Sequence, residues 1–112
     1  MREVDLEAFA AGLAAGAFVI DVREPDEYVA GHVPGVHSAP LSALGAVLDG
    51  LPADRPVYVI CASGNRSLRA AEQLATYGVD AASVAGGTAG WARTGRPLVS
   101  GPSASAPGHT GA

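Results

Sequence analysis

Short apolar runs alternate along the chain with segments that repeat at helical spacing. Residues 17–22, 57–60 and 81–84 are almost continuously apolar and rich in valine, isoleucine and alanine. Runs of this length are typical of strands buried on both faces of a parallel sheet. A further short strand is expected at 36–39. The pattern therefore predicts a sheet whose central strands carry little polar surface.

Segments with the helical repeat lie between these runs. Asp5 is placed to cap the first of them, because its carboxylate can accept the free N–H groups of a first turn. Alternation of strands with helices predicts an α/β sandwich. The predicted helices cover 5–16, 24–30, 41–51 and 67–78, followed by a short helix that ends near Trp91.

The chain has 112 residues, which is enough for one domain with a core and too few for two. Residues 1–99 are predicted to form this domain. Residues 100–112 contain mainly glycine, proline, serine and alanine, with almost no large apolar side chain. Such a composition cannot offset the entropy of ordering, so a flexible tail is expected.

The charge distribution disfavours two classes of partner. The formal net charge is −4, and the 7 basic residues are scattered along the chain. No basic stripe is available to follow a phosphate backbone, so nucleic acid is not expected as a partner. No apolar run approaches the roughly 20 residues that span a bilayer, and the first residues are charged. A cytoplasmic protein without a membrane partner is therefore expected.

The segment Cys61–Ser67 (CASGNRS) joins the apolar run 57–60 to a predicted helix. Ligands of parallel α/β sheets collect at the carboxyl ends of the strands, where this segment begins. Backbone N–H groups of a tight loop and the positive end of the following helix would surround an anion on the cysteine sulfur. Such a field favours the nucleophilic thiolate. Gly64 would allow the backbone to approach closely, and Arg66 would supply a cation.

Cys61 is the only cysteine, so the chain cannot form an internal disulfide. Together with His32, His37 and His109 it makes no metal-ligand spacing, and no metal is expected. Free cysteine is also a common apolar filler of protein cores. The strand, loop and helix context alone leaves both interpretations open, a catalytic nucleophile and a buried core residue.

Three separated motifs resemble those of a single-domain rhodanese and occur in the same order. The resemblance covers residues 4–99. It implies a three-layer α/β sandwich with a central, mainly parallel sheet flanked by helices. The motifs are Asp21–Tyr28 (DVREPDEY) followed by Gly31–Gly35 (GHVPG), then Cys61–Ser67, and finally Gly86–Trp91 (GGTAGW).

The resemblance also implies an activity and a set of site residues. A rhodanese takes a sulfane sulfur from thiosulfate or another donor and passes it to an acceptor such as cyanide or a thiol. Cys61 matches the family's nucleophile, which carries the sulfur as a persulfide without any cofactor. Ser67 is expected to begin the helix behind the loop. The residues that match the substrate-binding loop are Ala62, Ser63, Gly64, Asn65, Arg66 and Ser67.

Loop length separates this activity from a related one. Cysteine phosphatases and arsenate reductases of similar fold have one more residue between cysteine and arginine, whereas four residues separate Cys61 from Arg66. The shorter loop favours a single sulfur over a tetrahedral phosphate. A binding module that docks to another protein and seldom turns over is a third hypothesis, which the retained Cys61 and Arg66 disfavour.

The donor and acceptor are less well specified by the resemblance. Many rhodaneses that act on thiosulfate carry arginine or lysine early in the loop, where this chain has Ala62 and Ser63. A preference for thiosulfate is therefore left open. A protein persulfide donor, such as a cysteine desulfurase, is expected as readily as a small molecule.

Two other motif segments are predicted to have structural roles. Asp21 and Arg23 are expected to form a charged network, with Glu24 or Glu27 as further members. His32 is expected to be a hydrogen-bonding residue of a rigid turn.

Overall fold

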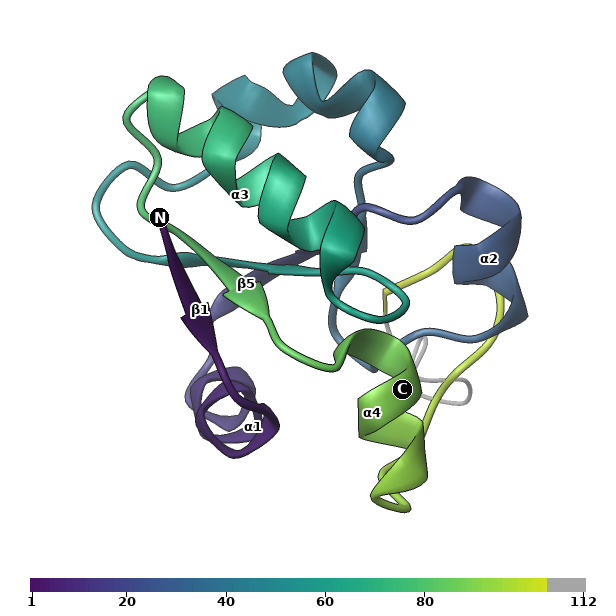
Figure 1. Cartoon of the computed structure of the whole chain (residues 1–112). Coiled ribbons are helices and arrows are strands. Elements are labelled where there is room, and N and C mark those ends of the chain that lie inside the picture. The colour runs from purple at the N-terminus through teal and green to yellow at the C-terminus, as the bar shows by residue number, and fades with distance from the viewer. Residues whose placement is uncertain (105–112) are drawn as a thin grey trace.

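The computed structural model describes residues 1–104 of the chain, and its centre is one five-stranded sheet (Figure 1). Every pairing in the sheet is parallel, and the strand order is β1-β5-β4-β2-β3. The predicted α/β class with a mainly parallel sheet is confirmed. The strands are β1 (Arg2–Val4), β2 (Phe18–Asp21), β3 (His37–Ser38), β4 (Val57–Ile60) and β5 (Ala81–Val84).

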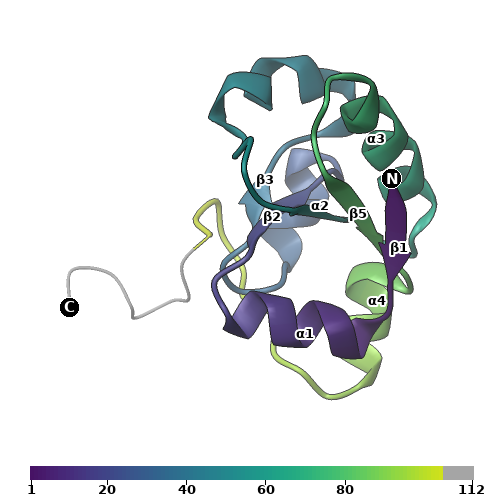
Figure 2. The ribbon, with the colours of Figure 1, turned by 90° about the vertical axis from the view of Figure 1, so that its left-hand side faces the viewer.

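Helices cover both faces of the sheet and complete three layers (Figures 1 and 2). One face carries η1 (Leu41–Gly50) and α3 (Asn65–Thr76), and the opposite face carries α1 (Leu6–Ala14) and α4 (Gly87–Arg93). The short helix α2 (Pro25–Ala30) follows β2. No helix within residues 1–104 combines the length and the apolar character needed to cross a membrane.

Side chains of β4 alternate between the two cores, as the two-residue period of a strand requires. Val57 and Val59 pack in the core beneath α3, whereas Ile60 packs with residues of α1 and α4. All three are fully buried. Burial of each such side chain stabilises the fold by about 1.5–3 kcal/mol, so the central strand anchors whatever follows it.

Three local features differ from the sequence-based prediction. The segment predicted as an amphipathic helix at 41–51 is the 3-10 helix η1, with non-helical backbone at Ala43. The edge strand β1 was not predicted, because it has only three residues and two of them, Arg2 and Glu3, are charged and exposed. Helix α3 begins at Asn65, so Ser67 lies in its first turn and does not begin it.

The C-terminal segment returns to the domain beyond its predicted boundary. Residues 101–104 fall in the predicted tail, yet three of them are bonded to α2 or to the turn that follows it, and Ser103 O lies 2.8 Å from His32 Nε2. Gly101 N–H donates to Val29 O at 2.8 Å, and Gly35 N–H donates to Ala104 O at 2.7 Å. The rest of the predicted tail, residues 105–112 with His109, lies outside the described residues.

Candidate active site

The loop that begins at Cys61 lies at the carboxyl end of β4, between strands β5 and β2. Gly64 precedes α3 with φ of +113°, a backbone conformation that residues with a Cβ rarely adopt. This turn reverses the chain directly over the end of the strand. The first N–H groups of α3 therefore lie near the cysteine, together with the positive end of the helix dipole.

The cysteine sulfur is surrounded by hydrogen-bond donors. Gly64 N–H donates to Cys61 Sγ at 3.1 Å, and the Ser67 hydroxyl lies 3.4 Å from the same sulfur. Burial raises the pKa of the thiol. Hydrogen bonds from the Ser67 hydroxyl and from the amides of Ser67, Gly64 and Ser63 outweigh this effect, so the pKa lies below its ordinary value. Cys61 is only 1% exposed, yet the loop amides face its sulfur.

The six predicted loop residues are placed differently around the sulfur. Ser63, Gly64 and Ser67 bring donors to it. Ala62 is half-buried at the base of the loop, and the Asn65 side chain is exposed. Arg66 is half-buried and directs its guanidinium to a carboxylate on α2. The backbone N–H groups of the predicted loop thus lie around the sulfur of Cys61, whereas the side chain of Asn65 faces solvent and that of Arg66 faces α2.

Arg66, which was predicted to supply a cation at the loop, is paired with a carboxylate. Its Nη1 and Nη2 donate to the two carboxylate oxygens of Glu27 on α2, at 2.7 and 3.0 Å. These bonds, with a further one from Glu24 N–H, lower the pKa of Glu27 from 4.5 to about 2. Glu27 in turn raises the pKa of Arg66. The charge that the loop offers to an incoming anion is therefore largely neutralised.

This ion pair makes a testable contribution to acid stability. Because the folded pKa of Glu27 lies below its ordinary value, its stabilising contribution is complete above pH 4.5 and is lost as the pH falls from there toward about 2. Glu27→Gln should lack this part of the pH dependence. The effect will be modest, since both side chains are about one-third exposed and screened by solvent, Glu27 at 34% and Arg66 at 37%.

Chemical denaturation at a series of pH values measures this contribution. Glu72→Gln is a matched control, because Glu72 is an exposed acidic residue of α3 with no ion pair among residues 1–104. The difference in unfolding free energy between wild type and Glu27→Gln should shrink on acidification. A difference that stays constant from pH 5 to pH 2 would contradict this assignment.

A second ion pair holds the end of β2 below the loop. Arg23 Nε and Nη2 donate to the Asp21 carboxylate at 2.8 to 3.1 Å, and Nη2 also donates to Gly31 O at 2.8 Å. Both charged side chains are buried. The predicted network of Asp21 and Arg23 is present. Glu27 belongs to the neighbouring Arg66 pair, and no ion pair within the described residues includes Glu24.

The start of α4 supports the loop from another side. Thr88 N–H donates to Cys61 O at 2.8 Å, and Ala89 N–H donates to Ala62 O at 3.0 Å. Gly87 permits this approach, since a Cβ there would lie 2.5 Å from Cys61 O. The loop is therefore fixed by main-chain contacts from α3 and α4.

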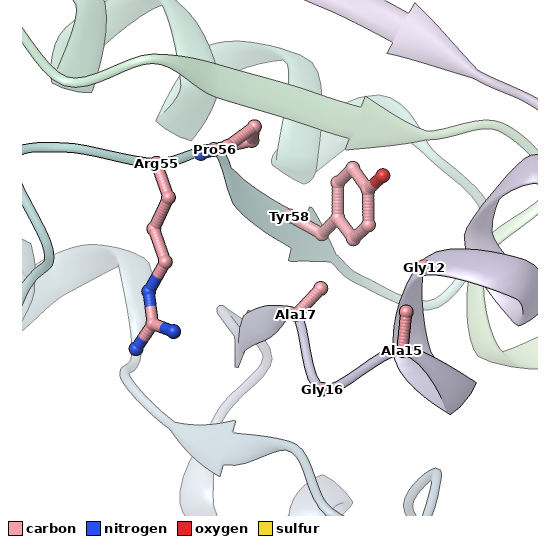
Figure 3. Close-up of a pocket in the computed structure, with 7 residues that line it drawn as sticks. All are labelled: Gly12, Ala15, Gly16, Ala17, Arg55, Pro56 and Tyr58. Atoms are coloured by element: carbon pink, nitrogen blue, oxygen red, sulfur yellow. The ribbon is translucent and has the colours of Figure 1, made fainter.

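Two cavities differ in their relation to this loop. A cavity of about 330 Å³ adjoins it and is lined by Ala62, Glu27 and Thr88 among others. A second cavity of about 230 Å³ lies where β2 and β4 begin, at the opposite end of these strands from Cys61. Figure 3 shows this second cavity, where the Arg55 side chain extends away from the Tyr58 ring. Of these two cavities, the first touches the loop, at Ala62.

Two polar contacts near the site were not predicted. Ser83 on β5 bonds Ser67 at 2.8 Å between the hydroxyl oxygens, and Glu27 binds Arg66 from 39 positions away in the chain. Ser83 lies within an apolar strand, so the sequence pattern gives no reason to assign it to the loop.

Across residues 1–104, no group of three or more histidine, cysteine, aspartate or glutamate side chains is arranged to hold a metal ion.

Comparison with known proteins agrees with this geometry. The profile of the family described as "Rhodanese-like domain" matches residues 5–94. The chain is 31% identical over 102 residues to a protein of Allochromatium vinosum named "Sulfurtransferase", covering 88% of this chain and 95% of that protein. It is 42% identical over 74 residues to the uncharacterised YqhL protein of Bacillus subtilis. That match covers 66% of this chain and 58% of YqhL, so the chain spans less than two-thirds of that relative.

A solved structure agrees over most of both chains. The crystal structure of a rhodanese-related protein from Thermoplasma volcanium is 34% identical, with a TM-score of 0.81, and the match covers 88% of this chain and 98% of that one. The predicted resemblance in the three motifs is thus matched by the family profile and by the fold. The chain belongs to the rhodanese-like domain family.

Proposed function

We propose that this chain is a sulfurtransferase that carries a sulfane sulfur on Cys61 as a persulfide. The observation that carries the proposal is the Gly64 N–H donating to Cys61 Sγ at 3.1 Å, inside a loop capped by the positive end of α3. A sulfur held in this way is stabilised as an anion without a metal or other cofactor. The relative from Allochromatium vinosum that bears the name of a sulfurtransferase supports the same activity.

The first half-reaction forms a sulfur–sulfur bond at Cys61. The thiolate attacks the outer sulfur of thiosulfate, the bond between that sulfur and the sulfonate group breaks, and sulfite leaves with its electron pair. The product is a persulfide anion whose charge resides on the terminal sulfur. The amides of Ser63, Gly64 and Ser67, which already lie around Sγ, are suited to accommodate that charge.

The second half-reaction returns the enzyme to its thiolate form. A nucleophilic acceptor, cyanide or a thiolate, attacks the terminal sulfur and takes it from Sγ. Thiocyanate or a new persulfide leaves, and Cys61 keeps the electron pair of the broken bond. The two steps balance without an added oxidant or reductant, which suits a loop that contributes only main-chain donors and one hydroxyl.

The residues around the loop, here called its rim, are positions 62, 63 and 66 together with Glu27. Their charges affect which sulfur donor can approach Cys61. Arg66 is paired with Glu27, and positions 62 and 63 hold alanine and serine. The rim therefore offers little net positive charge to the thiosulfate dianion. A persulfide donor with less charge, free or attached to a protein, meets less repulsion from Glu27. We propose both donor classes and expect the persulfide to load Cys61 faster.

Intact mass spectrometry of the protein after incubation with each donor tests the activity. Wild type should gain the mass of one sulfur atom, and a thiol reductant should remove it. Glu27→Gln should increase the rate of loading by thiosulfate more than that by an uncharged persulfide, because it removes a negative charge from the rim. Absence of any mass gain with every donor would refute the activity and favour a binding module.

A further inference from the structure

We propose that Ser83, on β5, is a positioning residue that donates its hydroxyl proton to Ser67 and thereby strengthens the hydrogen bond that Ser67 donates to the thiolate of Cys61. The three side chains form a continuous chain of polar atoms. Ser83 Oγ lies 2.8 Å from Ser67 Oγ, which lies 3.4 Å from Cys61 Sγ. Ser67 and Ser83 are 0% exposed, so water does not compete for these groups.

The available protons decide the direction of the hydrogen bonds. Each hydroxyl has one proton to donate and can accept two hydrogen bonds. Within residues 1–104, the Ser83 side chain bonds only to Ser67 Oγ, whereas Ser67 also reaches Gly64 O at 3.1 Å. A buried hydroxyl proton requires an acceptor. Ser83 therefore donates to Ser67, which keeps its own proton for another partner.

The partner of the Ser67 proton changes with the state of the sulfur. In the neutral thiol, Cys61 S–H donates to Ser67 Oγ, and Ser67 donates to Gly64 O. When the thiol ionises, the hydrogen bond from Cys61 S–H to Ser67 Oγ is lost. The Ser67 hydroxyl then rotates and donates its proton to the thiolate. Ser83 continues to donate to Ser67 Oγ, and a hydroxyl that accepts a hydrogen bond is a stronger donor itself. Ser83 thus stabilises the thiolate through Ser67.

Strand register explains how Ser83 comes to this position. In the pairing of β4 with β5, Ser83 stands opposite Val59, two residues before Cys61. Val59 and Ala81 both pack in the core beneath α3, and Ser83 shares their face by the two-residue period of a strand. The inference deepens the proposed function and rests on it in one respect only, that the thiolate is the reacting form.

Alkylation of Cys61 by iodoacetamide as a function of pH tests the role of Ser83. Cys61 is the only cysteine, so the rate reports the pKa of one group. Ser83→Ala should raise this pKa by about half a unit and slow alkylation about threefold below the pKa. Ser67→Ala should raise it further. The double variant should match Ser67→Ala, because Ser83 acts through Ser67.

An isosteric pair separates hydrogen bonding from packing. Ser83→Thr and Ser83→Val add nearly the same volume at the same buried position, but only threonine keeps a hydroxyl. Threonine should preserve the wild-type pKa and valine should raise it. Equal pKa values for these two variants would overturn the proposal, and so would an effect of Ser83→Ala that persists beside Ser67→Ala. Alkylation involves no sulfur transfer, so these results are independent of whether the protein forms a persulfide.

Discussion

Replacement of Cys61 by serine is expected to abolish sulfur loading while leaving the fold in place. Serine is close in size to cysteine, and Gly64 N–H can donate to its oxygen as it does to Sγ. A serine hydroxyl does not ionise in this loop and is a poor nucleophile toward sulfur. Thiocyanate formation from thiosulfate and cyanide should fall by at least about a thousandfold. Intact mass should show no added sulfur, and circular dichroism should be unchanged.

The matched control moves the thiol out of the loop. Ser38 is exposed on β3, so Ser38→Cys combined with Cys61→Ser keeps one cysteine but removes the donors around it. This double variant should not gain a stable sulfur from thiosulfate. Retained turnover by Cys61→Ser, or equal loading of the surface thiol, would refute the role of the loop.

Gly87→Ala is expected to destabilise the fold strongly. Gly87 has φ of +58°, and an added Cβ would lie 2.5 Å from Cys61 O and 2.6 Å from Ala62 O. Both contacts are with backbone atoms, which no change of side-chain rotamer can relieve. Either α4 or the loop must move, and the hydrogen bond from Thr88 N–H to Cys61 O is then weakened. The free energy of unfolding should fall by about 2–5 kcal/mol.

Gly78→Ala isolates the backbone part of this cost. Gly78 has φ of +82°, similarly left-handed, but a Cβ there meets nothing within 4 Å. This variant should lose only about 1–2 kcal/mol. Chemical denaturation of both variants gives the comparison, with sulfur loading of Gly87→Ala as a second measurement. Equal destabilisation of the two variants would show that contact between Gly87 and the loop is unimportant.

The buried strands and the main-chain loop were predictable because their signals are local. The runs at 57–60 and 81–84 coincide with β4 and β5, since strands covered on both faces need apolar side chains at every position. The edge strand β1 has only three residues and lacks that signal. The segment 41–51 shows the limit of periodicity, because a repeat of three to four residues does not separate an α-helix from the 3-10 helix η1.

The ion pair of Arg66 with Glu27 could not be predicted from local pattern, unlike that of Asp21 with Arg23. Arg66 and Glu27 lie 39 positions apart, and each belongs to a motif that gives it several candidate partners. In the folded protein Arg23 pairs with Asp21, and Glu27 pairs with Arg66. The outcome depends on how α2 packs beside the start of α3, and therefore on the assembled fold.

The sequence by itself determined which strands are central and that the one cysteine lies between a buried strand and a helix. These properties follow from hydrophobic periodicity and turn chemistry, which act over a few residues. Only the tertiary structure decided which groups surround the sulfur. Strand register sets Ser83 behind Ser67, and helix packing neutralises Arg66 with Glu27. Contacts between distant elements depend on register and packing, which a local pattern does not encode.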